Sequence, residues 1–402
     1  MGCIDDRNIS QAKVYSGDEV AAPVWSELNL RIAEGTSFFN LDDRPVVFSE
    51  ANQNLYGLNE TAAYIWCCLE ERRPLSAIAS ELAETGIPTH VAKAHMEEAL
   101  RAWLHIGLLK INHFDNELFA ARHSFTVSLG PLRITIRASN RDLQLRLNSL
   151  FSGQFEPAHT VEPAHIQEEI FHVTEMSGLS CVFHNGVNVI CCELDELAPS
   201  LKAYLAEQII MVKLPNVLFH AACVERGGKL ILVSGSPGAG KTTLTAYLLH
   251  KGFQYCSDDI VAIGPNGFIE GMPFAPTVKL DKSNILDGIR PDLKDAVIHI
   301  RPDGKRVRYL ESERLASGAK YDVGWIIFID RKPDCPIGLN PLSRLEAFRR
   351  LVEGSYSADN RLTISAFGAI RKILTSADSF ELSYSNAAEA ADMMVGLCDA
   401  RV

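Results

Sequence analysis

The sequence contains no Cys-x-x-Cys pair and no excess of basic residues. Its 10 cysteines lie mostly in apolar runs, a pattern typical of reduced core cysteines rather than of zinc ligands or a disulfide framework. The chain has 50 acidic and 39 basic residues, and the resulting formal net charge of −11 disfavours a general nucleic-acid-binding protein. We therefore expect no nucleic-acid partner and no zinc site.

Long apolar runs and targeting signals are also missing. No segment approaches the length of a membrane span, and the first residues lack the pattern of a signal peptide. We therefore expect a cytoplasmic protein that has no membrane partner. The hydrophobic content of 47% and the charged content of 22% are ordinary for globular domains, and 402 residues are enough for two or three of them.

A glycine-rich segment, residues 235–242, fills the pattern of a phosphate-binding loop (P-loop, or Walker A motif) without a mismatch. Residues 229–234 before it have the composition of a buried strand, and residues 243–251 after it have the apolar spacing of a helix that ends at Gly252. This order aims a helix dipole at a phosphate, so a plain glycine-rich turn is the disfavoured alternative. The predicted nucleotide-binding residues are Gly235, Ser236, Pro237, Gly238, Ala239, Gly240, Lys241, Thr242 and Thr243.

A phosphoryl-transfer site also needs an acidic residue that holds a metal ion or accepts a proton. Asp330 follows the apolar run 325–329, as in a Walker B strand, and the pair Asp258–Asp259 comes soon after the P-loop helix. For Asp330 we favour a simple strand-end role at the start of a turn. Two adjacent carboxylates are costly at a buried strand end unless a cation or a substrate proton uses them. We therefore prefer the pair.

His220 lies in a strand-like run, residues 218–224, ahead of the P-loop strand. A lone histidine there is ordinarily a satisfied core residue. However, the order and spacing of His220, the P-loop, Gly252 and Ser257-Asp258-Asp259 resemble the HPr kinase/phosphorylase family, over about residues 217–285 and more loosely beyond. The resemblance implies an α/β P-loop kinase that uses ATP and Mg²⁺.

The same resemblance implies a role for each matching residue. Lys241 would clamp phosphate, Thr242 and Asp258 would bind Mg²⁺, and Asp259 would accept the proton of a serine hydroxyl, with Asp258 and His220 lining the pocket. The family's further acidic metal ligand has no clear match, Glu270 being a weak candidate, and HPr itself is not expected as the substrate. A supporting arginine would come from a basic run that surface solvation explains equally well: Arg301, Arg306 or Arg308.

Residues 36–111 have the pattern of a small α+β module that resembles a winged helix. We expect strands at 44–48 and 54–58 and helices at 60–69, 75–82 and 91–105. Asn59 is the expected cap of the first helix and Thr89 that of the third.

The segment from Phe38 to Ile111, with Leu58-Asn59-Glu60-Thr61-Ala62-Ala63-Tyr64-Ile65-Trp66, resembles the PqqD-like recognition modules of ribosomal peptide maturation. That resemblance implies a leader peptide that adds a strand to an exposed sheet edge, which we place near residues 46–48, beside the helix 91–105. A DNA-binding winged helix is disfavoured, because this helix carries as many acidic as basic residues. A purely structural domain is the other alternative.

Further strands are expected at 125–130 and 133–137, followed by a helix near 200–211, with a junction at residues 120–122. The predicted fold class is therefore multidomain, α/β and α+β. Its segments are an N-terminal arm (1–34), a PqqD-like module (35–115), an α+β subdomain (123–215) and an HPr-kinase-like catalytic domain (216–402).

These expectations combine into an ATP-dependent kinase for a serine, or a threonine, of a ribosomally synthesised precursor peptide (RiPP). The PqqD-like module would hold the leader and so raise the local concentration of the acceptor. Other peptide-maturation enzymes are possible partners. A kinase of a free small molecule and a nucleotide-gated peptide chaperone remain as alternatives. The acceptor residue, the oligomeric state and the later fate of the phosphate stay open.

Overall fold

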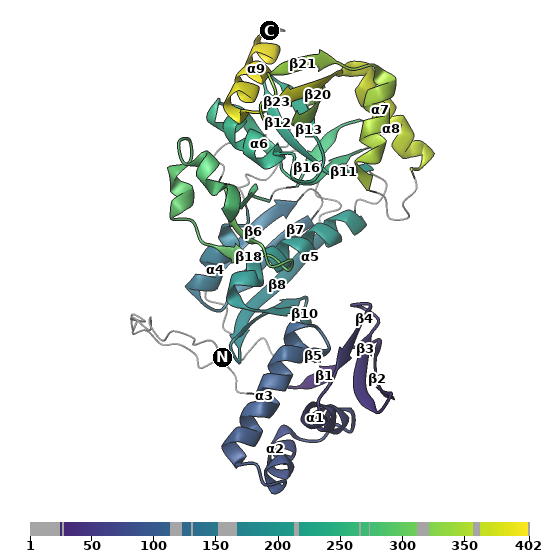
Figure 1. The fold of residues 1–402 in the computed structure, drawn as a ribbon, viewed down its shortest axis with the longest axis vertical. Helices are drawn as coiled ribbons and strands as arrows, with labels where there is room; N and C mark the ends of the chain where they lie inside the picture. Colours follow the sequence, from purple (N-terminus) through teal and green to yellow (C-terminus); the bar gives the residue numbers. More distant parts are fainter. Residues whose placement is uncertain are drawn as a thin grey trace.

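The computed structural model describes residues 25, 28–112, 123–129, 132–151, 167–212, 217–264, 267–272, 274–311, 321–356 and 362–400. Three units follow one another along the long axis (Figure 1). The N-terminal module lies at one end, a unit built on a five-stranded sheet lies in the middle, and a larger α/β unit lies at the other end. The predicted multidomain α/β and α+β fold class is confirmed. No helix within the described ranges is long and apolar enough to cross a membrane.

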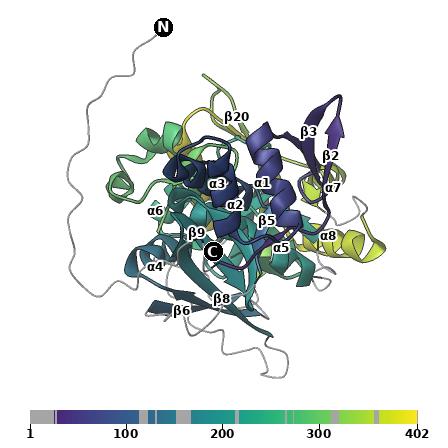
Figure 2. The same ribbon diagram turned by 90° about the horizontal axis from the view of Figure 1, so that it is seen from below.

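The N-terminal module combines two small sheets with three helices that form one core around Trp66 and Trp103, whose rings meet edge to face at 5.2 Å. In the view along the long axis, its β2–β3 hairpin projects at the periphery (Figure 2). The elements are β1 (Leu30–Ile32), β2 (Thr36–Leu41), β3 (Arg44–Ser49), β4 (Asn54–Gly57), α1 (Glu60–Glu70), α2 (Leu75–Glu84), α3 (Thr89–His105) and β5 (Leu109–Ile111).

The helix starts of this module test the predicted caps. Asn59 caps α1 as predicted, because its side chain accepts the N–H of Ala62 at 2.8 Å. The predicted cap at Thr89 is wrong. Pro88 occupies the N-cap position of α3 and Thr89 is already the first helical residue. The extended backbone of Pro88 starts the helix without a side-chain hydrogen bond.

The sheet order of the module overturns the predicted receiving edge. Residues 46–48 belong to β3, which pairs with β2 on one side and with β4 on the other. Both sides of β3 are therefore occupied, and β2 and β4 are the edge strands. Periodicity along one strand does not report the order of strands in a sheet, so the sequence could not decide this point.

Within the segment predicted as an N-terminal arm, β1 pairs with β5. The predicted junction at residues 120–122 lies outside the described residues.

The middle unit is a five-stranded sheet in the order β10-β9-β8-β7-β6, with α4 and α5 on one face. Its strand β9 is buried from both sides. Val182 faces the helices of its own unit, whereas Cys181 and Phe183 belong to the core of the N-terminal module. The module is thus packed onto the back of this sheet. The elements are β6 (His123–Leu129), β7 (Leu132–Ala138), α4 (Arg141–Asn148), β8 (Gln167–Met176), β9 (Leu179–His184), β10 (Val187–Cys192) and α5 (Leu197–Val212).

The C-terminal unit has three layers. A six-stranded sheet in the order β14-β12-β13-β20-β23-β21 lies between α6 and α9 on one face and α7 and α8 on the other. Strands β13, β20 and β23 are parallel, so their carboxyl ends meet at one edge of the sheet. The elements of this layer system are β12 (Ala221–Arg226), β13 (Lys229–Ser234), α6 (Lys241–His250), β14 (Gln254–Ser257), β20 (Asp322–Arg331), β21 (Gly338–Pro341), α7 (Arg344–Glu353), α8 (Ile364–Ser376), β23 (Asp378–Tyr384) and α9 (Ala387–Asp399).

Two smaller sheets complete the C-terminal unit. One has the order β16-β15-β11-β22, and the other has the order β17-β19-β18. The second sheet joins the core of the middle unit through Phe274, which precedes β17, and Tyr309, the last residue of β19. Their strands are β11 (Val217–Phe219), β15 (Val261–Ile263), β16 (Ile269–Gly271), β17 (Thr277–Lys279), β18 (His299–Ile300), β19 (Arg306–Tyr309) and β22 (Ser355–Tyr356). The predicted P-loop strand and helix are confirmed as β13 and α6.

Candidate active site

The P-loop connects the carboxyl end of β13 to the first turn of α6. Gly238 and Gly240 have φ values of +85° and +102°, a backbone conformation that side-chain-bearing residues rarely adopt. A Cβ at Gly235 would lie only 2.7 Å from Cγ1 of Ile329 on the neighbouring strand β20. The glycines therefore permit the tight backbone path by which N–H groups at a helix start bind phosphate.

Lys241 lies at the centre of this loop. Its side chain is buried, and its Nζ donates hydrogen bonds to the carbonyl oxygens of Gly235 at 2.7 Å and Ser236 at 3.3 Å. Burial lowers the pKa of Lys241, while the carboxylates of Asp258 and Asp259 act in the opposite direction. The loop thus holds a buried cation where the outer phosphates of a nucleotide would lie.

Asp258 follows β14 and faces the first turn of α6. The Thr242 hydroxyl donates to Oδ2 of Asp258 at 2.9 Å. Asp258 is only 4% exposed. Burial, and after it the adjacent Asp259 carboxylate, raises the pKa of Asp258 to about 6. A buried carboxylate beside a hydroxyl group is a donor set that suits a hard divalent cation.

The fit to Mg²⁺ depends on how many protein ligands that ion needs. Among the described residues, no group of three or more Asp, Glu, His or Cys side chains is placed to hold a metal ion. Mg²⁺ commonly takes one or two protein ligands and completes its shell with water and phosphate oxygens. Asp258 and Thr242 match that pattern, and the side chain of Glu270 lies outside the described part of the chain.

Asp259 has a strained backbone, with a φ of +99°. Nδ1 of His220 donates to the Asp259 backbone oxygen at 2.9 Å and lies 3.5 Å from its Oδ1. The Asp259 side chain is 49% exposed and lines the cavity in front of the P-loop. An unfavourable backbone conformation held by a neighbouring side chain is common where a side chain must be aimed at a ligand.

One cavity of about 450 Å³ brings together all four predicted catalytic residues: His220, Lys241, Asp258 and Asp259. Thr242, Thr243 and the tip of the P-loop line it as well. The opposite wall comes from β17 and the segment that follows it, and from the loop before β19. The sequence singled out only Arg301 of these wall residues, and missed Thr277, Lys279, Asp281 and Lys305.

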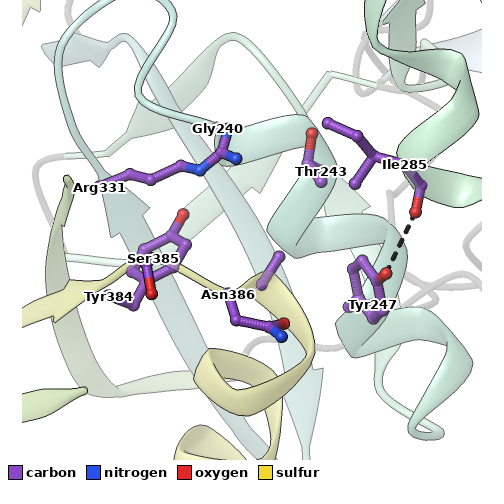
Figure 3. A pocket seen from close by; sticks show the side chains of 9 residues that line it. Gly240, Thr243, Tyr247, Ile285, Arg331, Tyr384, Ser385 and Asn386 are labelled. Carbon is purple, nitrogen blue, oxygen red and sulfur yellow. Dashed lines mark hydrogen bonds between the residues drawn. The ribbon is translucent and has the colours of Figure 1, made fainter. Parts of the chain in front are cut away.

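A second cavity, of about 340 Å³, continues along α6 (Figure 3). It is lined by Thr243 and Tyr247 of α6 and by Asn386 at the start of α9, and the Tyr247 hydroxyl donates to the Ile285 carbonyl at 3.1 Å. Arg331 extends from the end of β20 toward Gly240. Both cavities are lined by Gly240, Thr243 and Arg331, so they adjoin each other at the amino-terminal end of α6, and we call the two together the groove.

Of the other residues that the sequence offered as an acidic metal ligand or a supporting arginine, most do not line the groove. Asp330 pairs with Lys332 at 2.5 Å and is not among the residues lining either cavity. The preference for the Asp258–Asp259 pair therefore agrees with the geometry. Arg301 lines the first cavity and pairs with Asp303, whereas Arg306 and Arg308 line neither cavity.

Two further cations come from elements that the sequence did not connect with the site. Arg331 is the residue after Asp330, at the end of the strand beside β13. Lys202 comes from α5 of the middle unit, and its Nζ lies 3.7 Å from Oδ2 of Asp259. No local signal distinguishes Lys202 from an ordinary solvated lysine in an apolar helix, so only the packing of the two units reveals it.

Comparison with known proteins supports the reading of the N-terminal module. Residues 45–109 match the family model described as "Coenzyme PQQ synthesis protein D (PqqD)". No curated protein shows a significant match to the sequence. The predicted PqqD-like resemblance is therefore confirmed over residues 45–109.

Two solved structures are among those similar to parts of the chain. One, titled "TbiB1 in Complex with the TbiA(beta) Leader Peptide", is 23% identical, covers 21% of this chain and 99% of its own, and has a TM-score of 0.20. The other, the HPr(Ser) kinase/phosphatase from Coxiella burnetii, is 12% identical, covers 46% of this chain and 97% of its own, and has a TM-score of 0.22. The chain thus carries a PqqD region at its N-terminal end, and an HPr kinase/phosphatase is among the solved structures similar to it.

Proposed function

We propose that the chain is an ATP-dependent kinase that phosphorylates a serine or threonine hydroxyl of a ribosomally synthesised precursor peptide. The observation that carries the proposal is the convergence of two carboxylates with different surroundings on the P-loop cavity. Asp258 is buried against the Thr242 hydroxyl, whereas Asp259 is half exposed and faces the open part of the cavity. One carboxylate thus suits a metal ion and the other suits a proton.

In the proposed function the nucleotide would lie along the groove in one orientation. Its phosphates would lie on the P-loop with Lys241 beside them, and its nucleoside would occupy the second cavity near Thr243 and Tyr247. Arg331, which lines both cavities, would lie between the two ends of the nucleotide. Asp258 and Thr242 would hold Mg²⁺, which neutralises charge on the phosphate oxygens when bound.

The transfer step is assigned to Asp259. Its carboxylate accepts the proton of the peptide hydroxyl, the hydroxyl oxygen forms a bond to the γ-phosphorus, and the bond to the β–γ bridging oxygen breaks to release ADP. His220 donates a hydrogen bond to the backbone carbonyl of Asp259 and so fixes the position of the backbone from which the carboxylate extends. Lys241 stabilises the negative charge that develops on the phosphate oxygens.

The direct test is an incubation of the full chain with ATP, Mg²⁺ and the short precursor peptides encoded beside its gene. A gain of one phosphate on a serine or threonine of such a peptide is the expected result, detected by mass spectrometry. The matched control is the same peptide without its leader, which should be phosphorylated poorly. The control changes the peptide because the N-terminal module shares its core with the middle sheet, and deleting the module would expose Cys181 and Phe183. Absence of transfer to every such peptide would contradict the proposal.

Binding of Mg²⁺ should strengthen as the pH rises, because the metal ion binds the ionised form of Asp258. The pKa of Asp258 is raised to about 6, above its ordinary value, so the folded protein binds more protons than the unfolded chain between about pH 4 and 6. Stability from this group is therefore present at low pH and is lost as pH rises through that window. A metal ion binds the ionised form and offsets that loss. We expect ADP with Mg²⁺ to raise Tm more at about pH 7.5 than at about pH 5, measured against ADP with a chelator.

The control for this prediction is Asp258→Asn, which removes the titrating group and keeps the shape of the side chain. In that variant, the Mg²⁺-dependent part of the Tm shift should be small at both pH values. Equal Mg²⁺ effects in the wild type at both pH values would rule out Asp258 as the ligand.

The leader peptide is assigned to the edge of β4. Among the described strands, β4 pairs only with β3, so its other side is available for a further strand. The turn before β4 is tied to the end of α3, because the Asn52 side chain donates to the Ile106 carbonyl at 2.8 Å. A peptide added to β4 would therefore lie beside α3, whereas the edge of β2 lies at the periphery (Figure 2).

Two exposed leucines allow the two edges to be compared. Leu55 on β4 is 43% exposed and Leu41 on β2 is 50% exposed. We expect Leu55→Asp to raise the Kd for a leader peptide by about tenfold or more, because a buried carboxylate would replace an apolar contact. Leu41→Asp is the matched control and should leave the Kd within about twofold. Fluorescence polarisation with a labelled leader measures both, and the reverse order of effects would assign the peptide to β2.

A further inference from the structure

Lys202 of α5 lies beside Asp259, which lines the first cavity, and other groups hold the lysine in place. Its Nζ donates to Oγ1 of Thr277 at 2.7 Å. The rings of Phe274 and Tyr309 flank the ammonium group, with Nζ at 5.7 and 5.9 Å from their centroids. Groups other than Asp259, namely Thr277 of β17 and the two aromatic rings, therefore also hold this charge in position.

The burial of Lys202 is costly and needs a compensating charge. The side chain is 15% exposed, and burial lowers its pKa, whereas the nearby carboxylates of Asp259 and Asp258 favour the charged form. A buried ammonium group is stable only where opposite charges and hydrogen bonds offset its desolvation. Asp259 supplies the charge at 3.7 Å, and Thr277 supplies the hydrogen bond.

Asp259 in turn is held from two sides. His220 holds its backbone oxygen at 2.9 Å and lies 3.5 Å from Oδ1, and Nζ of Lys202 lies 3.7 Å from Oδ2, the other oxygen of the carboxylate. A residue with a φ of +99° keeps this conformation only when its surroundings over-determine it. Without a fixed positive charge, a half-exposed carboxylate has several rotamers of similar energy open to it.

We propose that Lys202 is a positioning residue for Asp259, which keeps the carboxylate turned toward the bound acceptor hydroxyl. This role rests on the proposed function, because it matters only if Asp259 accepts a proton. It also means that the catalytic site is incomplete without the middle unit, since α5 provides the charge that orients the proton acceptor of the C-terminal unit.

The test measures kcat and KM for precursor phosphorylation in the full chain. Lys202→Met keeps the length of the side chain and removes its charge. We expect kcat to fall by about 30- to 100-fold while the KM values for ATP and peptide change by less than about threefold. Lys202→Arg should recover about tenfold of that loss, because it restores a cation. Glu207→Gln, an exposed change on the same helix, is the control and should leave kcat unchanged.

A double variant shows whether Lys202 acts through Asp259. In the Asp259→Asn background, Lys202→Met should lower the residual rate by less than about twofold. If the Met variant does not fold, Thr277→Val carries the test: it removes the hydroxyl that holds Nζ, and kcat should fall by about tenfold with KM unchanged.

Three outcomes overturn the inference, and they are distinguishable. An unchanged kcat in a folded Lys202→Met variant removes the role. A loss of binding of a fluorescent ATP analogue, with kcat retained at saturation, makes Lys202 a nucleotide contact instead. A wild-type chain that transfers no phosphate to any precursor removes the proposed function itself, and the role of Lys202 with it, before any variant is needed.

Discussion

Asp259→Asn should lower kcat for phosphoryl transfer by about 10²- to 10⁴-fold while nucleotide binding is retained. The reason is chemical rather than steric, since the amide has the shape of the carboxylate but does not accept a proton at neutral pH. Asp259 is half exposed in the cavity, but the substitution removes the carboxylate that lies 3.7 Å from the buried Nζ of Lys202, so we expect some loss of Tm as well. Initial rates of precursor phosphorylation and the affinity for ADP, measured on the same samples, separate the two effects.

Asp330→Asn is the matched control for this prediction. Asp330 ends the strand next to the P-loop strand, but it pairs with Lys332 and is not among the residues lining either cavity. A surface ion pair of this kind contributes little to stability, so the variant should keep a kcat within about twofold of the wild type. If Asp330→Asn were inactive and Asp259→Asn active, Asp330 would be the acidic residue of the site, as in a Walker B strand, and the assignment of Asp259 would be wrong.

Lys241→Met should raise the Kd for ADP or ATP by about 100-fold or more, because it removes the cation that, in the proposed function, lies beside the outer phosphates. Lys241 is only 6% exposed, and its Nζ donates to the loop carbonyls of Gly235 and Ser236, so its charge is held at the loop itself. Titration calorimetry with ADP and Mg²⁺ measures the loss, and Tm shows whether the loop has kept its fold.

The control for the lysine variant lies at the other end of the same helix. Lys251 directly follows α6 and pairs with Asp392 at 2.6 Å, away from the groove. Lys251→Met removes one positive charge at the carboxyl end of α6, so it shows how far the loss of a charge alone changes nucleotide affinity. Its nucleotide affinity should match the wild type. Equal losses in both variants would mean that the P-loop lysine has no specific role.

Much of the candidate site was predictable because its parts are contiguous in the chain. The P-loop pattern at 235–242 requires glycines at particular positions, and two of them, Gly238 and Gly240, have positive φ values in the structure. The pair Asp258–Asp259 follows one helix later, where the next strand returns to the same edge of the sheet. His220 taken alone was a weak candidate for a catalytic residue. Only its spacing to the P-loop and to the aspartate pair favoured that role.

The wrongly predicted receiving edge and the missed groove residue have a different cause, which is the arrangement of strands in the sheets. The receiving edge was placed on residues 46–48, which form the central strand of their sheet, because alternation along a strand carries no information about its neighbours. At the end of β20 the sequence favoured a strand-end role for Asp330 and did not single out the next residue, Arg331, which lines both cavities. Which of two consecutive side chains reaches a cavity depends on the twist and register of the sheet around it.

The amino-acid sequence by itself determined the local pattern of this protein: a loop with the glycine spacing of a P-loop, a carboxylate pair behind it, and a module that matches the PqqD family over residues 45–109. Tertiary structure alone decided how those parts act on one another. Packing of α5 against β17 brings Lys202 to Asp259, and strand order leaves β4 rather than β3 at the edge. Such contacts join segments far apart in the chain, and their energy depends on burial and geometry that no local pattern encodes.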